Sequence, residues 1–308
     1  MKLQGKIVFS SGRAGDFDIW TVELGSGQCQ QLTQGDFMND MPRWSPDGQS
    51  VVYVSNRSGA PELWLMDENG HNQRQLTRQG RYHSHPCWAP HGRMVVCCAN
   101  YGNAQEVEIW TVPVDGGQPT LLVETPGLET EPCVSPDGTR VAFASNKSGN
   151  FDIWEIDIAT RRRRQVTSHP GKDFCPCYSP DGRWLSFVSR PSLEEDAEIW
   201  LVPADGGDQP VKLTENSRPD QYVSWAPDGS ALVYCSSKSG PGSGRIHLLD
   251  LEKLKGSMLD YNRSPMEQEI GAGVRDFGFF TWLMPDKLQR HFVDSAYFGS
   301  ERYPHWKF

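Results

Sequence analysis

Two histidines separated by one residue, His83 and His85, are the side chains in this chain best placed to hold a metal ion. They stand in the stretch His-Ser-His-Pro-Cys-Trp, which has the composition of a β-strand. Alternation along a strand points every second side chain to the same face, so both imidazoles are expected on one side. Neutral imidazole is a good ligand for Zn and related divalent ions. The spacing therefore predicts a candidate metal site.

Carboxylates occupy the corresponding positions of similar segments, each of which precedes a Pro-x-Gly turn. Aligned on that turn, the first column reads Asn39, His83, Glu129, Asp173 and Asp220. The second column reads Met41, His85, Glu131, Cys175 and Tyr222. We expect a divalent ion (Mn, Ca or Zn) to be held by His83, His85, Glu129 and Asp173, beside Asn39, Glu131, Asp220 and Tyr222. The alternative is a solvated polar surface whose charges balance.

A third column, two residues further on, is rich in thiols and is expected on the same face as the first two. It reads Arg43, Cys87, Cys133, Cys177 and Ser224, while the intervening positions are Trp44, Trp88, Val134, Tyr178 and Trp225. The thiols could face one another as a site. Small buried thiols that pack where strands converge would give the same pattern.

These columns belong to a repeat of about 45 residues, and its elements must position them. A triplet that usually ends in Trp marks the repeat at Asp18-Ile19-Trp20, Glu62-Leu63-Trp64, Glu108-Ile109-Trp110, Asp152-Ile153-Trp154, Glu198-Ile199-Trp200 and, in degraded form, Arg245-Ile246-His247. A tetrapeptide such as Ser45-Pro46-Asp47-Gly48 keeps the same spacing in five of the units. Ser, Pro and Gly at these places favour a type I turn, which predicts a hairpin between two strands.

Each unit holds four strand-like segments joined by short turns, which is the pattern of a propeller blade. The Trp-Ser-Pro-Asp-Gly hairpin, the acidic-apolar-Trp strand and a closing Leu-Thr resemble the repeat of the TolB propeller family from residue 6 to about residue 250. Similar repeats occur in the propellers of prolyl-oligopeptidase-type peptidases and of oligogalacturonate lyases. The first resemblance implies a non-enzymatic propeller that binds a protein, a peptide or a small ligand at the mouth of its central channel.

The lyase resemblance implies an alternative, a metal-dependent lyase or hydrolase that acts on an acidic sugar. His83-Ser84-His85-Pro86 is similar to a His-Pro-His-Pro stretch in which two histidines help to hold a metal. The chain lacks a clear counterpart of that family's other ligands and catalytic residue, and that family's propeller has seven blades. A Gly-x-Ser-x-Gly nucleophile elbow is also absent, which argues against a peptidase.

Closure of the ring predicts six four-stranded antiparallel blades in one all-β domain over residues 1–308. The first repeat lacks an innermost strand, because Lys6-Ile7-Val8-Phe9 already aligns with a second strand. The segment from Phe277 to Leu283 is expected to supply that strand and to leave no free sheet edge. Residues 251–275 are expected to form an irregular loop that carries the outer edge of the last blade, followed by a closing strand and tail over 276–308.

Composition limits the partners and the location. The net charge of −9 lacks the basic footprint that nucleic acid requires, and no apolar stretch is long enough to insert into a membrane. The first residues do not resemble a signal peptide, so we expect a cytoplasmic location, or a periplasmic one if a leader was removed. The eight cysteines are scattered, which favours reduced thiols over a disulfide framework.

Overall fold

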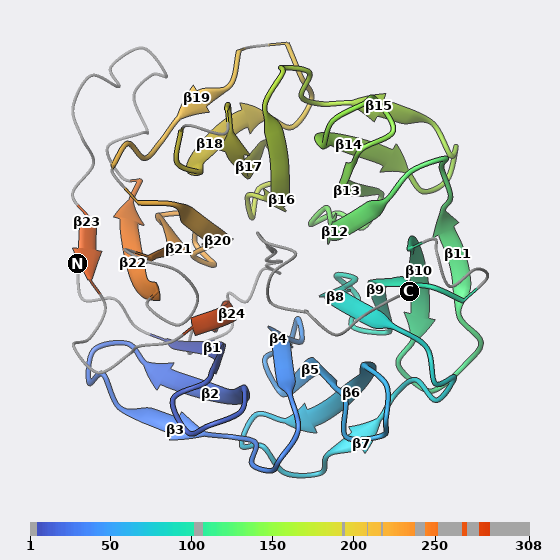
Figure 1. Cartoon of the computed structure of the whole chain (residues 1–308), viewed down its shortest axis with the longest axis vertical. Helices are drawn as coiled ribbons and strands as arrows, with labels where there is room; N and C mark the ends of the chain where they lie inside the picture. The colour runs from blue at the N-terminus through green and yellow to red at the C-terminus, as the bar shows by residue number, and fades with distance from the viewer. Residues whose placement is uncertain are drawn as a thin grey trace.

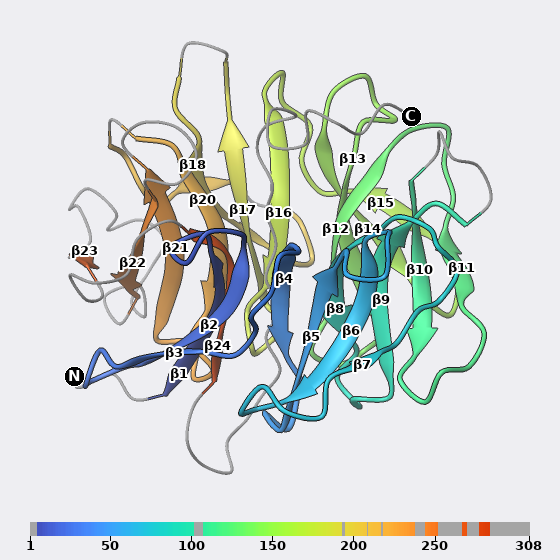
Figure 2. The same ribbon diagram turned by 60° about the horizontal axis from the view of Figure 1, so that its bottom comes forward.

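The computed structural model describes residues 5–101, 107–192, 195–207, 209–216, 218–237, 244–251, 267–269 and 277–283, the last two segments as backbone only. Six four-stranded antiparallel sheets stand around a central axis as the blades of a propeller (Figure 1). Figure 2 shows the blades side by side around this axis. The predicted fold class, a six-bladed propeller, is confirmed.

In blades 2 to 6 the chain runs from the axis outward, and in blade 1 the late strand β24 takes the innermost place. The strands, innermost first, are β24 (Phe277–Leu283), β1 (Lys6–Ser11), β2 (Asp18–Glu23) and β3 (Cys29–Gln31) in blade 1; β4 (Asn39–Trp44), β5 (Ser50–Ser55), β6 (Glu62–Asp67) and β7 (Arg74–Gln75) in blade 2; β8 (His83–Trp88), β9 (Met94–Ala99), β10 (Glu108–Pro113) and β11 (Thr120–Val123) in blade 3; β12 (Glu129–Val134), β13 (Arg140–Ser145), β14 (Asp152–Asp157) and β15 (Arg163–Gln165) in blade 4; β16 (Lys172–Tyr178), β17 (Trp184–Arg190), β18 (Glu198–Pro203) and β19 (Val211–Lys212) in blade 5; and β20 (Asp220–Trp225), β21 (Ala231–Ser237), β22 (Gly244–Asp250) and β23 (Glu267–Glu269) in blade 6.

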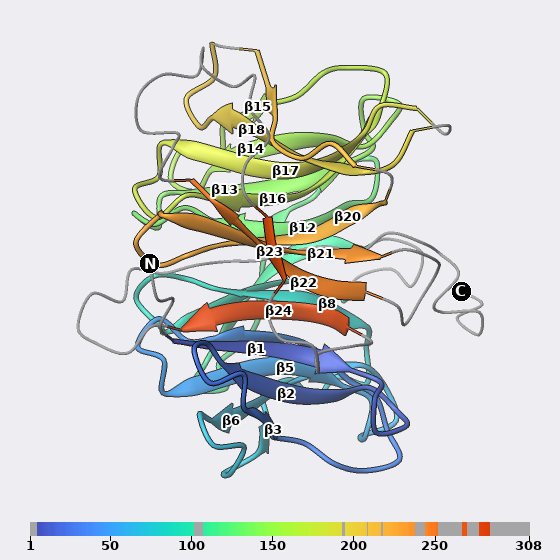
Figure 3. The same ribbon diagram turned by 90° about the vertical axis from the view of Figure 1, so that its left-hand side faces the viewer.

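Strand β24 closes the ring. It pairs antiparallel with β1, with Lys6 opposite Leu283 and Phe9 opposite Phe280, and Figure 3 shows the two strands side by side. The prediction that this segment completes the first blade is confirmed. Strand β23 pairs with β22 at the outer edge of blade 6, as expected for the segment 251–275. The other residues of that segment after Leu251, and the tail after Leu283, lie outside the described residues.

The tetrapeptide turns join the first and second strands of blades 2 to 6. In blade 2 the Gly48 N–H donates to the Ser45 carbonyl at 2.8 Å, and the Ser45 hydroxyl donates to Asp47 at 2.6 Å. The backbone at Gly48 has a φ of 68°, which glycine adopts without steric cost. Buried aliphatic side chains of the second and third strands, such as Val52 and Leu63, fill the space between blades.

Every innermost strand from β4 to β20 carries a bulge, which overturns one expectation. In β4, Asn39 and Asp40 lie opposite Ser55 and Val54, but Arg43 lies opposite Val52. One extra residue in a strand moves all later side chains to the other face. The first and third columns therefore lie on opposite faces, and the expectation that all three columns share one face is wrong.

Candidate functional site

The first column lies at the interfaces between blades. Each of its residues is fully buried, and its backbone N–H donates to a carbonyl of the preceding blade, as Asn39 does to Phe17 at 2.7 Å. The Asn39 side chain also donates to Asp18 at 3.0 Å, and Asp18 is the acidic residue of the preceding Trp triplet. The column is therefore buried at blade interfaces and not solvated at the channel mouth.

His83 makes the equivalent contact one blade further on. Its Nδ1 lies 3.1 Å from the Glu62 carboxylate, and its Nε2 lies 2.7 Å from the Tyr101 hydroxyl. Burial alone would raise the pKa of Glu62, but hydrogen bonds from His83 and Thr77 lower it below its usual value. The imidazole thus serves as the partner of a buried acid.

The three later interfaces place a second acid, Glu129, Asp173 or Asp220, at this position. Burial raises the pKa of Glu129 to about 7. Burial also raises the pKa of Asp220 to about 7, and the charge of Glu198 adds to the shift. The interfaces of Glu129 and Asp220 therefore hold carboxyl groups that bind a proton near neutral pH.

Asp173 has a partner that the sequence reasoning missed. The Nε2 atom of His169 lies 2.8 Å from Asp173 Oδ1, and its Nδ1 accepts the Gly171 N–H at 3.0 Å. The hydrogen bond to Asp173 raises the pKa of His169. The acids of the Trp triplets were also missed as partners, although their recurrence at the first position of five triplets was a usable signal.

The second column forms what we call the ring: Met41, His85, Glu131, Cys175 and Tyr222. All five residues have left-handed backbones, with φ values of 54°, 49°, 57°, 60° and 59° in that order. They belong to the strands nearest the axis in Figure 1, namely β4, β8, β12, β16 and β20. Each is at most 7% exposed.

Neighbouring ring members touch one another from blade to blade. The His85 N–H points at the Met41 sulfur at 3.2 Å, and the Cys175 N–H donates to Glu131 Oε2 at 2.8 Å. His85 Nε2 lies 4.0 Å from Glu131 Oε1. Burial lowers the pKa of His85 to about 3, and the nearby charge of Arg43 adds to the effect, so this imidazole is neutral at physiological pH.

The third column is buried below the ring. The Cys87 sulfur accepts the Val134 N–H at 3.3 Å, and the Cys133 sulfur accepts the Tyr178 N–H at 3.2 Å. Burial raises the pKa of Cys87 to about 12 and that of Cys133 well above its usual value. Cys87 and Cys133 are therefore protonated and poor nucleophiles, which agrees with their interpretation as packing residues.

The four predicted metal ligands lie in separate surroundings. His83 faces Glu62, His85 belongs to the ring, Glu129 accepts from Ser145 at 3.3 Å, and Asp173 pairs with His169. In the part of the chain that the structure describes, no three His, Cys, Asp or Glu side chains are grouped closely enough to hold a metal ion. Metal binding by these residues stays a prediction.

The mouth end of the propeller, where the innermost strands begin, presents ordered basic side chains. The guanidinium groups of Arg13 and Arg57 lie 4.8 and 4.5 Å from the ring centres of Trp20 and Trp64. In blade 4 the Lys147 ammonium lies 3.4 Å from the ring centre of Trp154. Cation–π contacts of this kind fix long side chains that would otherwise move freely.

Leu128, just before β12, is 43% exposed at the same end. Among the described residues, Leu128 alone is a large hydrophobic side chain that is exposed. The mouth end thus combines an apolar side chain with basic groups held in place.

The six blades form a closed β-propeller. Around its axis, the ring carries a different side chain on each of five innermost strands. The chain belongs to the TolB beta propeller domain family, whose sequence model matches residues 4–125 and 111–263. The resemblance found in the sequence is confirmed.

One curated relative is a protein TolB homolog from Chlorobium luteolum, which is 28% identical over 144 residues. The matched segment covers 47% of this chain and only 31% of the relative.

Solved structures share the fold. TolB from Acinetobacter baumannii aligns with a TM-score of 0.75 at 18% identity, over 92% of this chain and 68% of its own. A putative TolB from Agrobacterium tumefaciens aligns with a TM-score of 0.69 at 20% identity, over 94% and 96%. An oligogalacturonate lyase in complex with manganese aligns with a TM-score of 0.54 at 17% identity, over 87% and 74%. Identities this low establish the fold alone.

Among the described residues, no helix is long and apolar enough to cross a membrane. The cellular location of the chain stays a prediction.

Proposed function

We propose that this chain is a non-enzymatic TolB-like propeller that binds a protein, a peptide or a small ligand at the mouth of its central channel. The observation that carries the proposal is the ring. Five innermost strands repeat the same left-handed backbone, but each places a different side chain there: Met41, His85, Glu131, Cys175 and Tyr222.

A left-handed backbone costs a non-glycine residue about 1–2 kcal/mol, and such strain is concentrated at functional sites. Glycine would remove this cost, yet no ring position is glycine. A purely structural repeat could also use one residue type throughout. Because these side chains are at most 7% exposed, the ring would shape the floor beneath a ligand bound at the mouth, and the exposed groups around the mouth would make most of the direct contacts.

The surface around the mouth suits a macromolecular partner. Arg57 is held between Phe37 and Trp64, with its guanidinium 4.6 and 4.5 Å from the two ring centres. Ordered Arg side chains are among the residues that carry most binding energy at interfaces. The exposed Leu128 adds apolar area that a partner could bury. Little side-chain entropy is lost when such a surface binds a partner.

The alternative is a metal-dependent lyase or hydrolase that acts on an acidic sugar. Its support is the shared fold with a lyase that is described in complex with manganese. The predicted ligands lie in separate surroundings, three at different blade interfaces and His85 in the ring, which does not favour this alternative. Retention of Mn, Ca or Zn by the purified protein, lost on changing His83 or His85, would favour this alternative.

Photo-crosslinking tests the proposed binding end. A benzophenone amino acid replaces Leu128 at the mouth end or Thr139 at the turn end of the same blade, since both residues are exposed and flank β12. In cells of the source organism, we expect a discrete adduct from position 128 and none from position 139. Equal adducts from both positions, or an adduct from position 139 alone, would contradict the proposal.

A further inference from the structure

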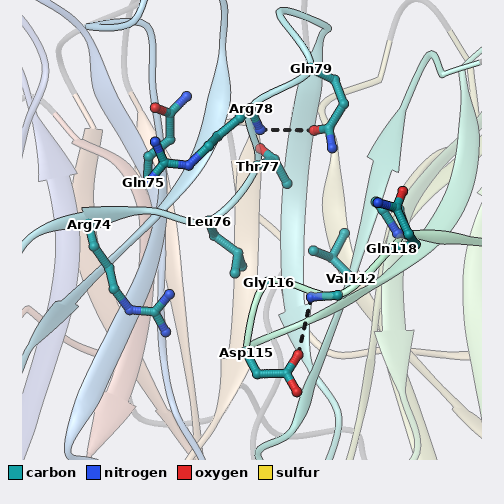
Figure 4. Close-up of a pocket in the computed structure, with 12 residues that line it drawn as sticks. Arg74, Gln75, Leu76, Thr77, Arg78, Gln79, Val112, Asp115, Gly116 and Gln118 are labelled. Atoms are coloured by element: carbon teal, nitrogen blue, oxygen red, sulfur yellow. Dashed lines mark hydrogen bonds between the residues drawn. The ribbon is translucent and has the colours of Figure 1, made fainter.

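A groove opens on the outer rim between blades 2 and 3, far from the ring along each blade. Its volume is about 280 Å³. Figure 4 shows Arg74, Leu76 and Arg78 of blade 2 on one side and Asp115 and Gln118 of blade 3 on the other. We call this feature the rim groove.

The corresponding place between blades 1 and 2 is closed. Gly70 and Gly116 occupy the same position in their hairpins, since each N–H donates to the carbonyl three residues earlier, of Asp67 and Pro113. A Cβ atom on Gly70 would lie 2.6 Å from the Leu32 carbonyl of blade 1, but one on Gly116 would meet nothing within 4 Å. The rim groove is therefore a departure from the repeat.

The corresponding place between blades 4 and 5 is filled by an internal ion pair. Arg164 lies opposite Glu155 in the sheet, its Nε donates to that carboxylate at 2.8 Å, and its Nη2 donates to the Ala204 carbonyl. Arg74 makes the equivalent carbonyl bond to Val114 at 2.9 Å. Its opposite residue, however, is Leu65, so the carboxylate that neutralises Arg164 has no counterpart beside Arg74.

Arg78 is a second exposed arginine of the lining, and its side chain has no carboxylate partner among the described residues. The lining contains one acid, Asp115, whose Oδ1 accepts the Gly117 N–H at 3.2 Å. The guanidinium fork matches carboxylate and phosphate oxygens, with two parallel hydrogen bonds. We propose that the rim groove binds a small anion that carries a carboxylate or a phosphate group, with the arginines of its lining as the cationic partners.

Isothermal titration with inorganic phosphate and with succinate tests the proposal and separates the two sources of the anion. The wild type is expected to bind at least one of them with saturation. The double variant Arg74→Gln, Arg78→Gln should bind about tenfold more weakly or worse, because hydrogen bonds to charged groups are lost. The control Arg162→Gln removes an exposed arginine of blade 4 and should bind like the wild type.

A second variant leaves both arginines in place. Leu65→Glu puts a carboxylate opposite Arg74, as Glu155 lies opposite Arg164, and is expected to compete with the anion and weaken its binding. If Leu65→Glu does not fold, the double arginine variant still decides. Absence of saturable binding to the wild type, or equal binding by the double arginine variant, would overturn the proposal.

Discussion

At the scale of single residues, the blade interfaces show three solutions to one problem, a buried acid at the start of each Trp triplet. Asn39 donates an amide hydrogen to Asp18, and His83 supplies an imidazole to Glu62. The interface of Glu198 instead holds the second acid Asp220, which is fully buried. Two buried acids that share a site cannot both ionise without cost, so this interface depends on pH.

Asp220→Asn should stabilise the protein at pH 8. The folded state raises the pKa of Asp220 to about 7, so this group destabilises the fold as pH rises from about 4 through 7. An amide there can donate to Glu198, as Asn39 does to Asp18. We expect a gain on the order of 1–3 kcal/mol in the free energy of unfolding at pH 8, fading toward pH 4.

Urea denaturation at several pH values measures this gain. Asp196→Asn is the control, because it removes one exposed negative charge from the neighbouring blade 5 and should change little at any pH. A stability curve for Asp220→Asn parallel to that of the wild type would show that Asp220 ionises normally in the folded protein.

The sequence was sufficient to align the residues of the candidate site in columns. It was not sufficient to predict the face of the strand to which each side chain points. The repeat identified all three columns correctly. Strand alternation then placed His83 and His85 on one face, whereas the bulge separates them. The bulge depends on a left-handed backbone at residues such as His85 and Cys175. Non-glycine residues seldom adopt that conformation, so the sequence does not predict it.

At the scale of elements, hairpin chemistry made most strands predictable. Ser-Pro-Asp-Gly specifies its own turn through local hydrogen bonds, such as that from Gly48 to Ser45, and it therefore marks the ends of two strands. The pairing of β24 with β1 joins segments from opposite ends of the chain, and it followed from the count of strands in the repeat. The rim groove could not be foreseen, because it depends on how two neighbouring hairpins meet.

A chain that ends at Val274 tests closure by β24. Loss of this strand would leave the hydrogen-bonding edge of β1 unpaired, and exposed sheet edges recruit other chains. We expect aggregation and no cooperative thermal melt by circular dichroism. A chain that ends at Pro285 keeps β24 and is the matched control. A soluble, cooperatively melting protein ending at Val274 would show that β24 is dispensable.

At the scale of the whole molecule, the propeller separates architecture from recognition. Turns, Trp triplets and buried interface acids repeat from blade to blade and hold the six blades together. Function is expected where the repeat is varied, at the ring residues around the axis and at the rim groove between blades 2 and 3. The two proposed sites lie on different surfaces, so binding at one can be measured while the other is altered.

Hydrogen–deuterium exchange with the partner recovered by crosslinking tests the central claim, that ligands bind at the mouth end over the ring. Within blade 4, a peptide spanning 124–131 covers Leu128 and Glu131, and one spanning 135–140 covers the turn at the opposite end of β12. We expect slower exchange in the first peptide when the partner is bound and no change in the second. Protection of the turn peptide, with the mouth peptide unchanged, would contradict it.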